Sequence, residues 1–176
     1  MIIDFFNISA KLKKVPRQGW IDKLSLNTPE SVAEHTFSMA IIGMIFSDLE
    51  GYDTEKILKI ILLHDLAESI IGDIIPEQIS KEQKIELENN AMQKILNNLP
   101  DTLQKKYSEL WIEYQSNQSK EAKIVHQVDK LEMALQAKIY SKEGHPKDKL
   151  NSFFNTARNE ITDPKLLSLF EELVKK

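Results

Sequence analysis

The chain lacks cysteine entirely and is poor in glycine and proline, with five and six copies among 176 residues. Without cysteine there is no disulfide framework, no thiolate zinc site and no cysteine nucleophile. The sequence contains no convincing alternation of apolar and polar residues, so few or no strands are expected. Nor does any stretch approach roughly 18 uncharged apolar residues, which predicts that the chain has no membrane span.

An excess of basic charge is also missing, because 23 lysines and arginines stand against 27 acidic residues. The formal net charge of -4 and the absence of a basic stripe predict no stable binding to nucleic acid. Asp4 lies where a signal peptide would carry positive charge, so we expect a cytoplasmic protein. The length and an apolar fraction of 41% fit one domain, residues 1–176, with a sizeable core.

Apolar residues recur at helical spacing along nearly the whole chain. The pattern predicts seven or eight helices with short connections, which is typical of a compact all-α bundle. Ser31 with Glu34 and Ser80 with Gln83 form capping-box pairs at two helix starts, and Pro76 is expected to close a loop. The predicted helices cover approximately residues 3–13, 28 or 31 to 49, 53–70, 80–98, 100 through at least 114, 119 to just before 144, 149–160 and 164–175.

The most informative segment is Leu-Leu-His-Asp-Leu-Ala-Glu at 62–68. A run this apolar favours burial, yet it contains His64, Asp65 and Glu68. Burying an unpaired charge is costly, so these groups need partners. Coordination of a metal ion is one arrangement that satisfies them together.

Two more candidate ligands lie far away in similarly apolar surroundings, His35 on the second predicted helix and Asp129 on the sixth. Each residue alone has a structural explanation: a core histidine is usually hydrogen-bonded, and Asp129 could pair with Lys130. The combination is stronger, because three helices of a bundle can converge on one ion. Two imidazoles and two carboxylates suit zinc, manganese, iron or cobalt.

Two further carboxylates follow closely. Glu68 lies four residues after His64 and therefore on the same face of a continuous helix. Asp73 follows Gly72, just beyond the predicted helix end. Carboxylates beside a metal can move the protons of a hydrolytic reaction or hold a second ion. The alternative is a solvated glutamate and a turn aspartate.

The order H…HD…D resembles the signature of the HD-domain metal phosphohydrolases. Segments 15–20, 29–35, 64–68 and 72–74 are most similar to the 5′-deoxynucleotidase branch of that family, of the HD domain-containing protein 2 type. The likeness covers roughly residues 6–140. It implies an all-α HD fold, a homodimer, and a divalent ion (Mn, Co, Zn, Fe or Mg) held by His35, His64, Asp65 and Asp129.

The resemblance also implies catalytic and substrate-binding roles. Glu68 would be the catalytic carboxylate, and Asp73 would assist in proton transfer. The same two residues, with the Ile74 carbonyl, are alternatively ligands of a second ion. Arg17 would contact the substrate phosphate, and Trp20 would lie beside the sugar and disfavour a 2′-hydroxyl.

In one place the chain departs from the family pattern. The bacterial 5′-deoxynucleotidases have adjacent arginine and tryptophan, whereas Gln18 and Gly19 separate Arg17 from Trp20 here. The alternatives are a hydrophobic plug for Trp20 and an ordinary surface charge for Arg17.

The implied activity is hydrolysis of deoxyribonucleoside 5′-monophosphates to deoxynucleoside and phosphate. One alternative keeps the metal and changes the substrate to a cyclic nucleotide, a nucleoside triphosphate or an alarmone. Another is a non-catalytic helical interaction module with a structural metal, for which Trp111 and Tyr114 would supply an exposed aromatic surface unless they belong to the core. His126 is expected to face solvent or another helix, and His145 to lie in a loop.

Overall fold

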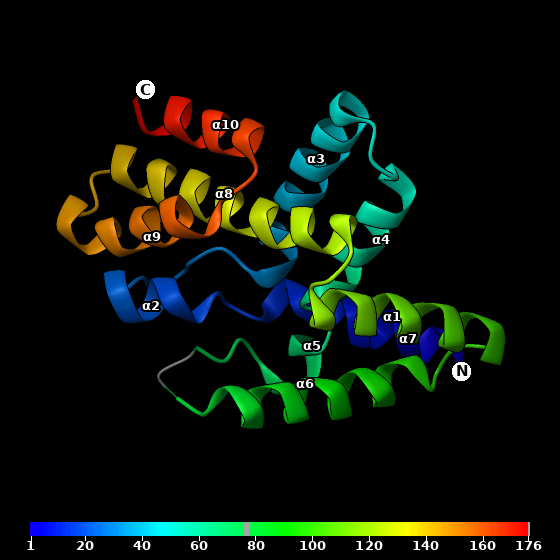
Figure 1. The fold of residues 1–176 in the computed structure, drawn as a ribbon. Helices are drawn as coiled ribbons and strands as arrows, with labels where there is room; N and C mark the ends of the chain where they lie inside the picture. Colours follow the sequence, from blue (N-terminus) through cyan, green and yellow to red (C-terminus); the bar gives the residue numbers. More distant parts are fainter. Residues whose placement is uncertain (76–77, 176) are drawn as a thin grey trace.

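A computed structural model describes residues 1–75 and 78–175 (Figure 1). Pro76 lies outside the described residues. The described residues form helices joined by short connections, which confirms the all-α prediction. The helices are α1 (Ile2–Ser9), the 3₁₀ helix η1 (Ala10–Lys14), α2 (Gln18–Leu24), α3 (Val32–Glu50), α4 (Thr54–His64), α5 (Glu68–Ile71), α6 (Lys81–Leu96), α7 (Asp101–Ser116), α8 (Lys120–Lys142), α9 (Lys147–Glu160) and α10 (Pro164–Lys175).

The helix starts follow local capping chemistry. Ser31 caps α3 and accepts from the Glu34 backbone N–H, while the Glu34 carboxylate accepts from Ser31. Ser80 and Gln83 form the same reciprocal pair at the start of α6. Ser119 caps α8. Each side chain satisfies a backbone donor that the first turn leaves without a partner.

The third predicted helix is wrong in its extent, because α4 ends at His64 and a turn separates it from the short α5. The Nδ1 atom of His64 lies 2.6 Å from the Ile61 carbonyl, which the Asp65 N–H would use in a continuing helix. Asp65 is instead the C-cap residue, with φ −109° and ψ 13°. The break turns Asp65 out of the helical path.

The sequence-based prediction also missed α2, which lies between the first two predicted helices, residues 3–13 and 28 or 31 to 49. Gly19 lies inside α2, where a Cβ would meet the ring of Phe153 at 3.8 Å. Trp20 and Leu24 are buried in the core, and this packing outweighs the weak helix propensity of glycine.

The long helix α8 runs through the centre of the molecule, with α9 and α10 along one side and α3 and α4 on another (Figure 1). The largest core cluster joins α3, α4, α8 and α10 through residues such as Phe46, Ile60, Val128 and Phe170. The helices α3 and α4 approach closely at Gly43, where a Cβ would collide with Ile61. Because α3 and α4 are antiparallel, the start of α3 lies beside the end of α4.

One pair of backbone segments outside the helices is joined by an isolated antiparallel bridge between Pro16 and Ser31. The Arg17 N–H donates to the Glu30 carbonyl at 3.0 Å, and the Val32 N–H donates to the Val15 carbonyl at 2.8 Å. The bridge fixes the segment before α2 against the start of α3.

By length and composition, α3 is the one helix of the described residues that could cross a membrane, with a mean hydropathy of 1.2. It packs against both α4 and α8 and carries core residues such as Met39. We therefore assign it as a core helix, a class that passes the same test. Its opposite face is also apolar, with Phe37, Ile41, Ile45 and Leu49 exposed.

Candidate metal centre and active site

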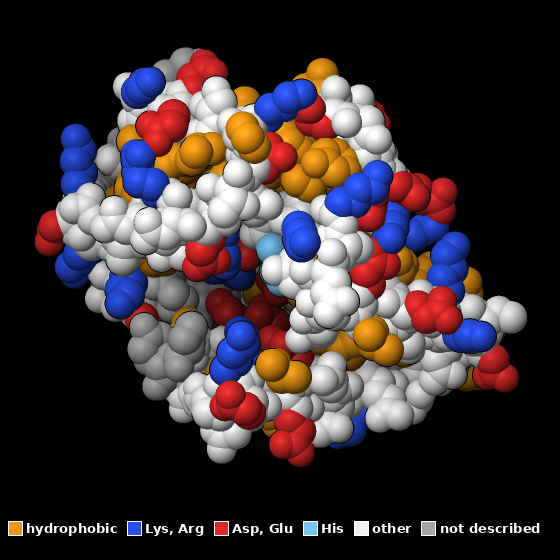
Figure 2. Space-filling view, viewed as in Figure 1, with side chains coloured by type: hydrophobic (Ala, Val, Ile, Leu, Met, Phe, Trp, Pro, Cys, Tyr) orange, Lys and Arg blue, Asp and Glu red, His pale blue; other side chains and the backbone are white. Residues whose placement is uncertain are grey.

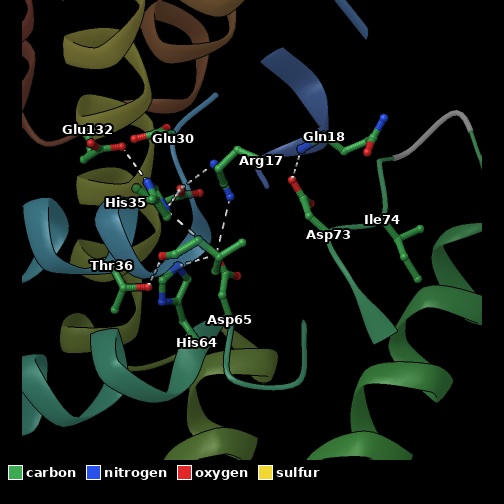
Figure 3. A network of polar contacts seen from close by, with 12 residues as sticks. Arg17, Gln18, Glu30, His35, Thr36, His64, Asp65, Asp73, Ile74 and Glu132 are labelled. Carbon is green, nitrogen blue, oxygen red and sulfur yellow. Dashed lines mark hydrogen bonds and ion pairs between the residues drawn. The ribbon is translucent and has the colours of Figure 1, made fainter. Parts of the chain in front are cut away.

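The four predicted ligands come together in the structure (Figure 3). One ligand atom each from His35, His64 and Asp129 lies within 4.8 Å of the others. The Oδ2 atom of Asp65 is 2.9 Å from Nε2 of His64 and 3.8 Å from Nε2 of His35. Residues from α3, the end of α4 and the middle of α8 therefore share one small volume.

Both imidazoles present the same nitrogen to this volume. The Nδ1 atom of His35 is 2.5 Å from Oε2 of Glu132, and Nδ1 of His64 bonds the Ile61 carbonyl. The two Nε2 atoms are buried and make no hydrogen bond to any described residue, although carboxylate oxygens lie beside them. Two orphaned nitrogens next to carboxylates are a donor set that fits a divalent ion such as zinc or manganese.

The two aspartates are held as anions. Burial would raise the pKa of Asp65, but His64 and Arg17 outweigh it and keep this pKa below its usual range. Burial opposes ionisation of Asp129 as well, yet Lys130, at 2.9 Å, contributes to a pKa well below the ordinary value. Anionic carboxylates are what a cation site requires.

His35 behaves differently. Burial and the charge of Arg17 would lower its pKa, but Asp129 and Glu132 prevail and raise the pKa to about 9. In the absence of an ion the site therefore favours a proton on this ring. A divalent cation would take the place of that proton's charge, because a ligating imidazole must be neutral.

Glu68 lies at the start of α5, and its side chain is buried. Its Oε2 atom makes no hydrogen bond to any described residue. Burial, then the charges of Asp65 and Asp73, raise the pKa of Glu68 well above the ordinary value. The structure therefore disagrees with the alternative of a solvated glutamate.

Asp73 joins the connection after α5 to the start of α2, because its Oδ2 accepts a hydrogen bond from the Gln18 N–H at 2.8 Å. The neighbouring Ile74 carbonyl accepts from Nζ of Lys84 at 2.7 Å. Lys84 thus supplies a positive charge at the carbonyl that the family resemblance assigns to a second ion.

Arg17 is not an ordinary surface charge. Its guanidinium lies 3.4 Å from Asp65 and 4.0 Å from Asp129, and only 17% of its side chain is exposed. Burial would lower its pKa, but these two carboxylates raise the pKa above the usual value. Arg17 therefore partly neutralises the site's carboxylates.

Trp20 is packed in the core, as the alternative of a hydrophobic plug describes. Only 2% of the residue is exposed. Its ring packs on Phe153 and Tyr140, with centroids 4.1 and 5.1 Å away. Its Nε1 donates to Oε1 of Glu30 at 2.8 Å. The sugar contact implied by the family resemblance stays a prediction, and it requires the indole to leave this packing.

Sequence reasoning missed Glu30 and Glu132, which form a second cluster behind His35. Burial and the charge of Glu132 raise the pKa of Glu30 to about 7. The available signal for Glu132 was its spacing, since it lies three residues after Asp129 and so on the same face of α8. The position of Glu30 depends on the Pro16–Ser31 bridge, and no spacing in the sequence indicates that Glu30 lies near His35.

The other residues singled out in the sequence lie away from the ligand cluster or in the core. His126 stacks on Tyr114, with centroids 4.2 Å apart, as expected for a contact with another helix. Trp111 is 5% exposed and donates to Asn89, so it does not supply an exposed aromatic surface. His145 lies in the connection before α9, with its ring edge-on to Tyr140.

The molecular surface is hollowed on one face (Figure 2). Acidic and histidine side chains are visible inside the hollow, and lysine or arginine side chains lie around it. The accessible acids suit a cation, and the basic groups suit an anion that binds beside it.

Helices that converge on two imidazoles and two carboxylates in the order H…HD…D define a protein of the HD class. The chain belongs to the HD domain family, whose model matches residues 9–167.

Within this family the chain is similar to proteins named 5′-deoxynucleotidase HDDC2. The human protein is 37% identical over 98% of this chain and 84% of its own length. The Dictyostelium discoideum protein is 40% identical over 97% and 95%. Among solved structures, a conserved hypothetical protein from Pyrococcus furiosus matches with a TM-score of 0.80 and 32% identity over 99% of both chains. A protein from Pyrococcus horikoshii matches with a TM-score of 0.79 and 33% identity, over 98% of this chain and 95% of its own.

Proposed function

We propose that this protein is a metal-dependent 5′-deoxynucleotidase, which hydrolyses deoxyribonucleoside 5′-monophosphates to deoxynucleosides and phosphate. The observation that carries the proposal is the meeting of His35, His64, Asp65 and Asp129 around one volume. The relatives named 5′-deoxynucleotidase support it, because this chain spans most of their length.

These four residues would hold the catalytic ion, which can be Mn, Co, Zn, Fe or Mg. A bound divalent ion lowers the pKa of water and stabilises negative charge on a phosphoryl group. Arg17 would bind the substrate phosphate, since its guanidinium offers forked donors and already lies over Asp65 and Asp129.

Two carboxylates would move the protons. Glu68 takes one from the attacking water as the new oxygen–phosphorus bond forms, because burial and the nearby carboxylates raise its pKa and so make it a stronger base than an ordinary carboxylate. Asp73 supplies a proton to the 5′ oxygen as the old bond breaks. In an alternative arrangement Glu68, Asp73 and the Ile74 carbonyl hold a second ion, for which Lys84 must leave that carbonyl.

We also propose that residues 1–176 form a single HD-type domain that works as a cytoplasmic homodimer, without nucleic-acid or membrane partners. The exposed apolar face of α3, defined above by Phe37, Ile41, Ile45 and Leu49, supports a second copy as the partner. Light scattering coupled to size-exclusion chromatography should give twice the chain mass of 20.3 kDa. A stable monomer would contradict the proposed dimer but would not count against the proposed activity.

The decisive experiment removes metal with a chelator, restores one divalent ion at a time, and measures phosphate release. The substrates are the deoxyribo- and ribonucleoside 5′-monophosphates, a cyclic nucleotide, a nucleoside triphosphate and a guanosine alarmone. We expect ion-dependent release from the deoxyribonucleoside monophosphates. Turnover only of another class would transfer the proposal to that substrate, and no turnover with any ion would falsify the enzymatic proposal.

A further inference from the structure

The two imidazoles of the candidate metal centre are held by unlike partners (Figure 3). The Nδ1 atom of His64 lies 2.6 Å from the neutral Ile61 carbonyl. The Nδ1 atom of His35 lies 2.5 Å from the carboxylate of Glu132. Hydrogen bonds to an ionised acceptor are roughly twice as strong as neutral ones, so the two rings are not equivalent.

Glu132 is buried to an unusual degree for a carboxylate. It is 1% exposed, and His35 is completely buried. Among the ion pairs of residues 1–75 and 78–175, Glu132 pairs with His35, and no lysine or arginine is paired with it. Glu30, another acid, lies within 4.8 Å of both. A buried carboxylate beside a second acid is costly unless positive charge compensates it.

Helix geometry connects Glu132 to the ion site directly. It lies three residues after Asp129 on α8, so both side chains project toward the start of α3. Asp129 approaches His35 at Nε2, at 3.2 Å, and Glu132 approaches the same ring at Nδ1. One turn of α8 therefore contacts both nitrogens of one imidazole.

We propose that Glu132 is a positioning residue of the metal centre, which accepts the Nδ1–H of His35 and fixes the tautomer whose Nε2 faces the ion. Acting through His35, it also makes the imidazole a stronger donor to a cation. The inference rests on the proposed function only in taking the cluster of His35, His64, Asp65 and Asp129 as the metal site.

The test compares two buried glutamates of the same helix. Glu132→Gln removes the charge while keeping the side-chain shape. Glu121→Gln is the matched control, because Glu121 is 5% exposed and pairs with Lys56, at about 12 Å along α8 from Asp129. Chelator-treated proteins are titrated with Co²⁺ in a calorimeter. We expect affinity to fall about 10- to 100-fold in Glu132→Gln, the usual effect of losing such a partner, and to stay near wild type in Glu121→Gln.

A spectroscopic readout separates positioning from a structural role. In Zn²⁺-loaded wild-type protein, proton–nitrogen spectra of the histidine rings should show a strongly downfield Nδ1–H signal for His35. In Glu132→Gln this signal should move upfield while that of His64 stays in place. If Glu132 only stabilised the fold, the Nδ1–H signals of both rings would shift together.

Three results would overturn the proposal. One is a folded Glu132→Gln protein that binds Co²⁺ as tightly as wild type. Another is an equal loss in Glu121→Gln. The third needs no variant, and is a His35 ring protonated on Nε2 in the Zn²⁺-loaded wild type. None of these depends on nucleotide hydrolysis, so a wild-type protein that binds Co²⁺ but releases no phosphate would count against the proposed function alone.

Discussion

Two carboxylates beside the candidate metal centre, the half-buried Asp65 and the buried Glu68, carry opposite pKa shifts. The pKa of Asp65 is held below its usual range, against burial, by His64 and Arg17. The pKa of Glu68 is raised well above its ordinary value by burial and by Asp65 itself. Carboxylates whose pKa values are driven apart can divide the work of a site, one staying charged and the other exchanging protons. Asp65 therefore suits ligation, and Glu68 suits proton transfer.

Replacing Glu68 with glutamine should lower kcat by about 100-fold or more, the usual scale for losing an acid–base group. The fold and the bound metal should survive, because glutamine keeps the size and shape of the glutamate side chain and Glu68 is not one of the four candidate ligands. Steady-state kinetics, metal analysis and urea unfolding measure the three quantities. Near wild-type turnover would remove Glu68 from the reaction.

The second prediction at this scale concerns Trp20. Trp20→Phe keeps an aromatic ring against Tyr140 and Phe153 but removes the N–H donor to Glu30. An acceptor left without its partner should lower the free energy of unfolding by about 1–2 kcal/mol in urea titrations. The ratio of kcat/KM for deoxyribo- over ribonucleotides should change less than about threefold, since the indole is buried. A tenfold fall in that ratio would establish the sugar contact that the family resemblance implies.

At the scale of helices, the features that could be predicted from sequence are local. The Ser31–Glu34 and Ser80–Gln83 boxes are satisfied within one turn, so their residue types suffice. The meeting of the four metal-ligand candidates was also predictable, because apolar neighbours direct the segments that carry them toward the core and their order H…HD…D matches the family signature.

The features that could not be predicted depend on contacts distant in sequence. The end of α4 involves the bond between the His64 ring and the Ile61 carbonyl. The α2 helix is stabilised where Trp20 packs on Phe153 of α9. Glu132 acquires its role only where α8 meets His35, and spacing alone does not reveal which acid on a helix turns inward.

The capping boxes give a matched pair of variants. Ser31→Ala and Ser80→Ala should each lower the free energy of unfolding by about 1 kcal/mol, the typical contribution of an N-cap. Only Ser31→Ala should also weaken Co²⁺ binding, because its box holds the first turn of α3, which contains His35. Urea unfolding and calorimetry measure the two effects. Equal loss of Co²⁺ affinity in both variants would contradict this link between cap and site.

For the whole molecule, protonation of the metal-free site links stability to pH. The pKa of His35 is raised from 6.5 to about 9, and that of Glu30 from 4.5 to about 7. Both groups bind protons more tightly in the folded state, so their stabilisation is complete below the unfolded pKa and declines as pH rises through the folded one. The lowered pKa values of Asp65 and Asp129 act in acid, where stability falls as they become protonated.

Binding of a divalent ion should offset the loss of stability at alkaline pH. The ion competes with the protons on the same atoms, so its affinity rises with pH. The increase in melting temperature on adding a fixed excess of Co²⁺ should therefore be larger by several degrees at about pH 8.5 than at about pH 6. Scanning calorimetry with and without the ion gives this difference. An increase that is the same at both pH values would show that the titrating groups lie outside the ion site.

The Pro16–Ser31 bridge has a consequence for how the molecule can move. The backbone hydrogen bonds beside it join the segment that contains Arg17 to the residues that precede His35. A small shift of α3 along its axis would therefore move Arg17 in the same direction. The distance between Arg17 and the four candidate ligands should therefore change little. Under the proposed roles of these residues, a substitution that breaks the bridge is expected to weaken both substrate binding and ion binding.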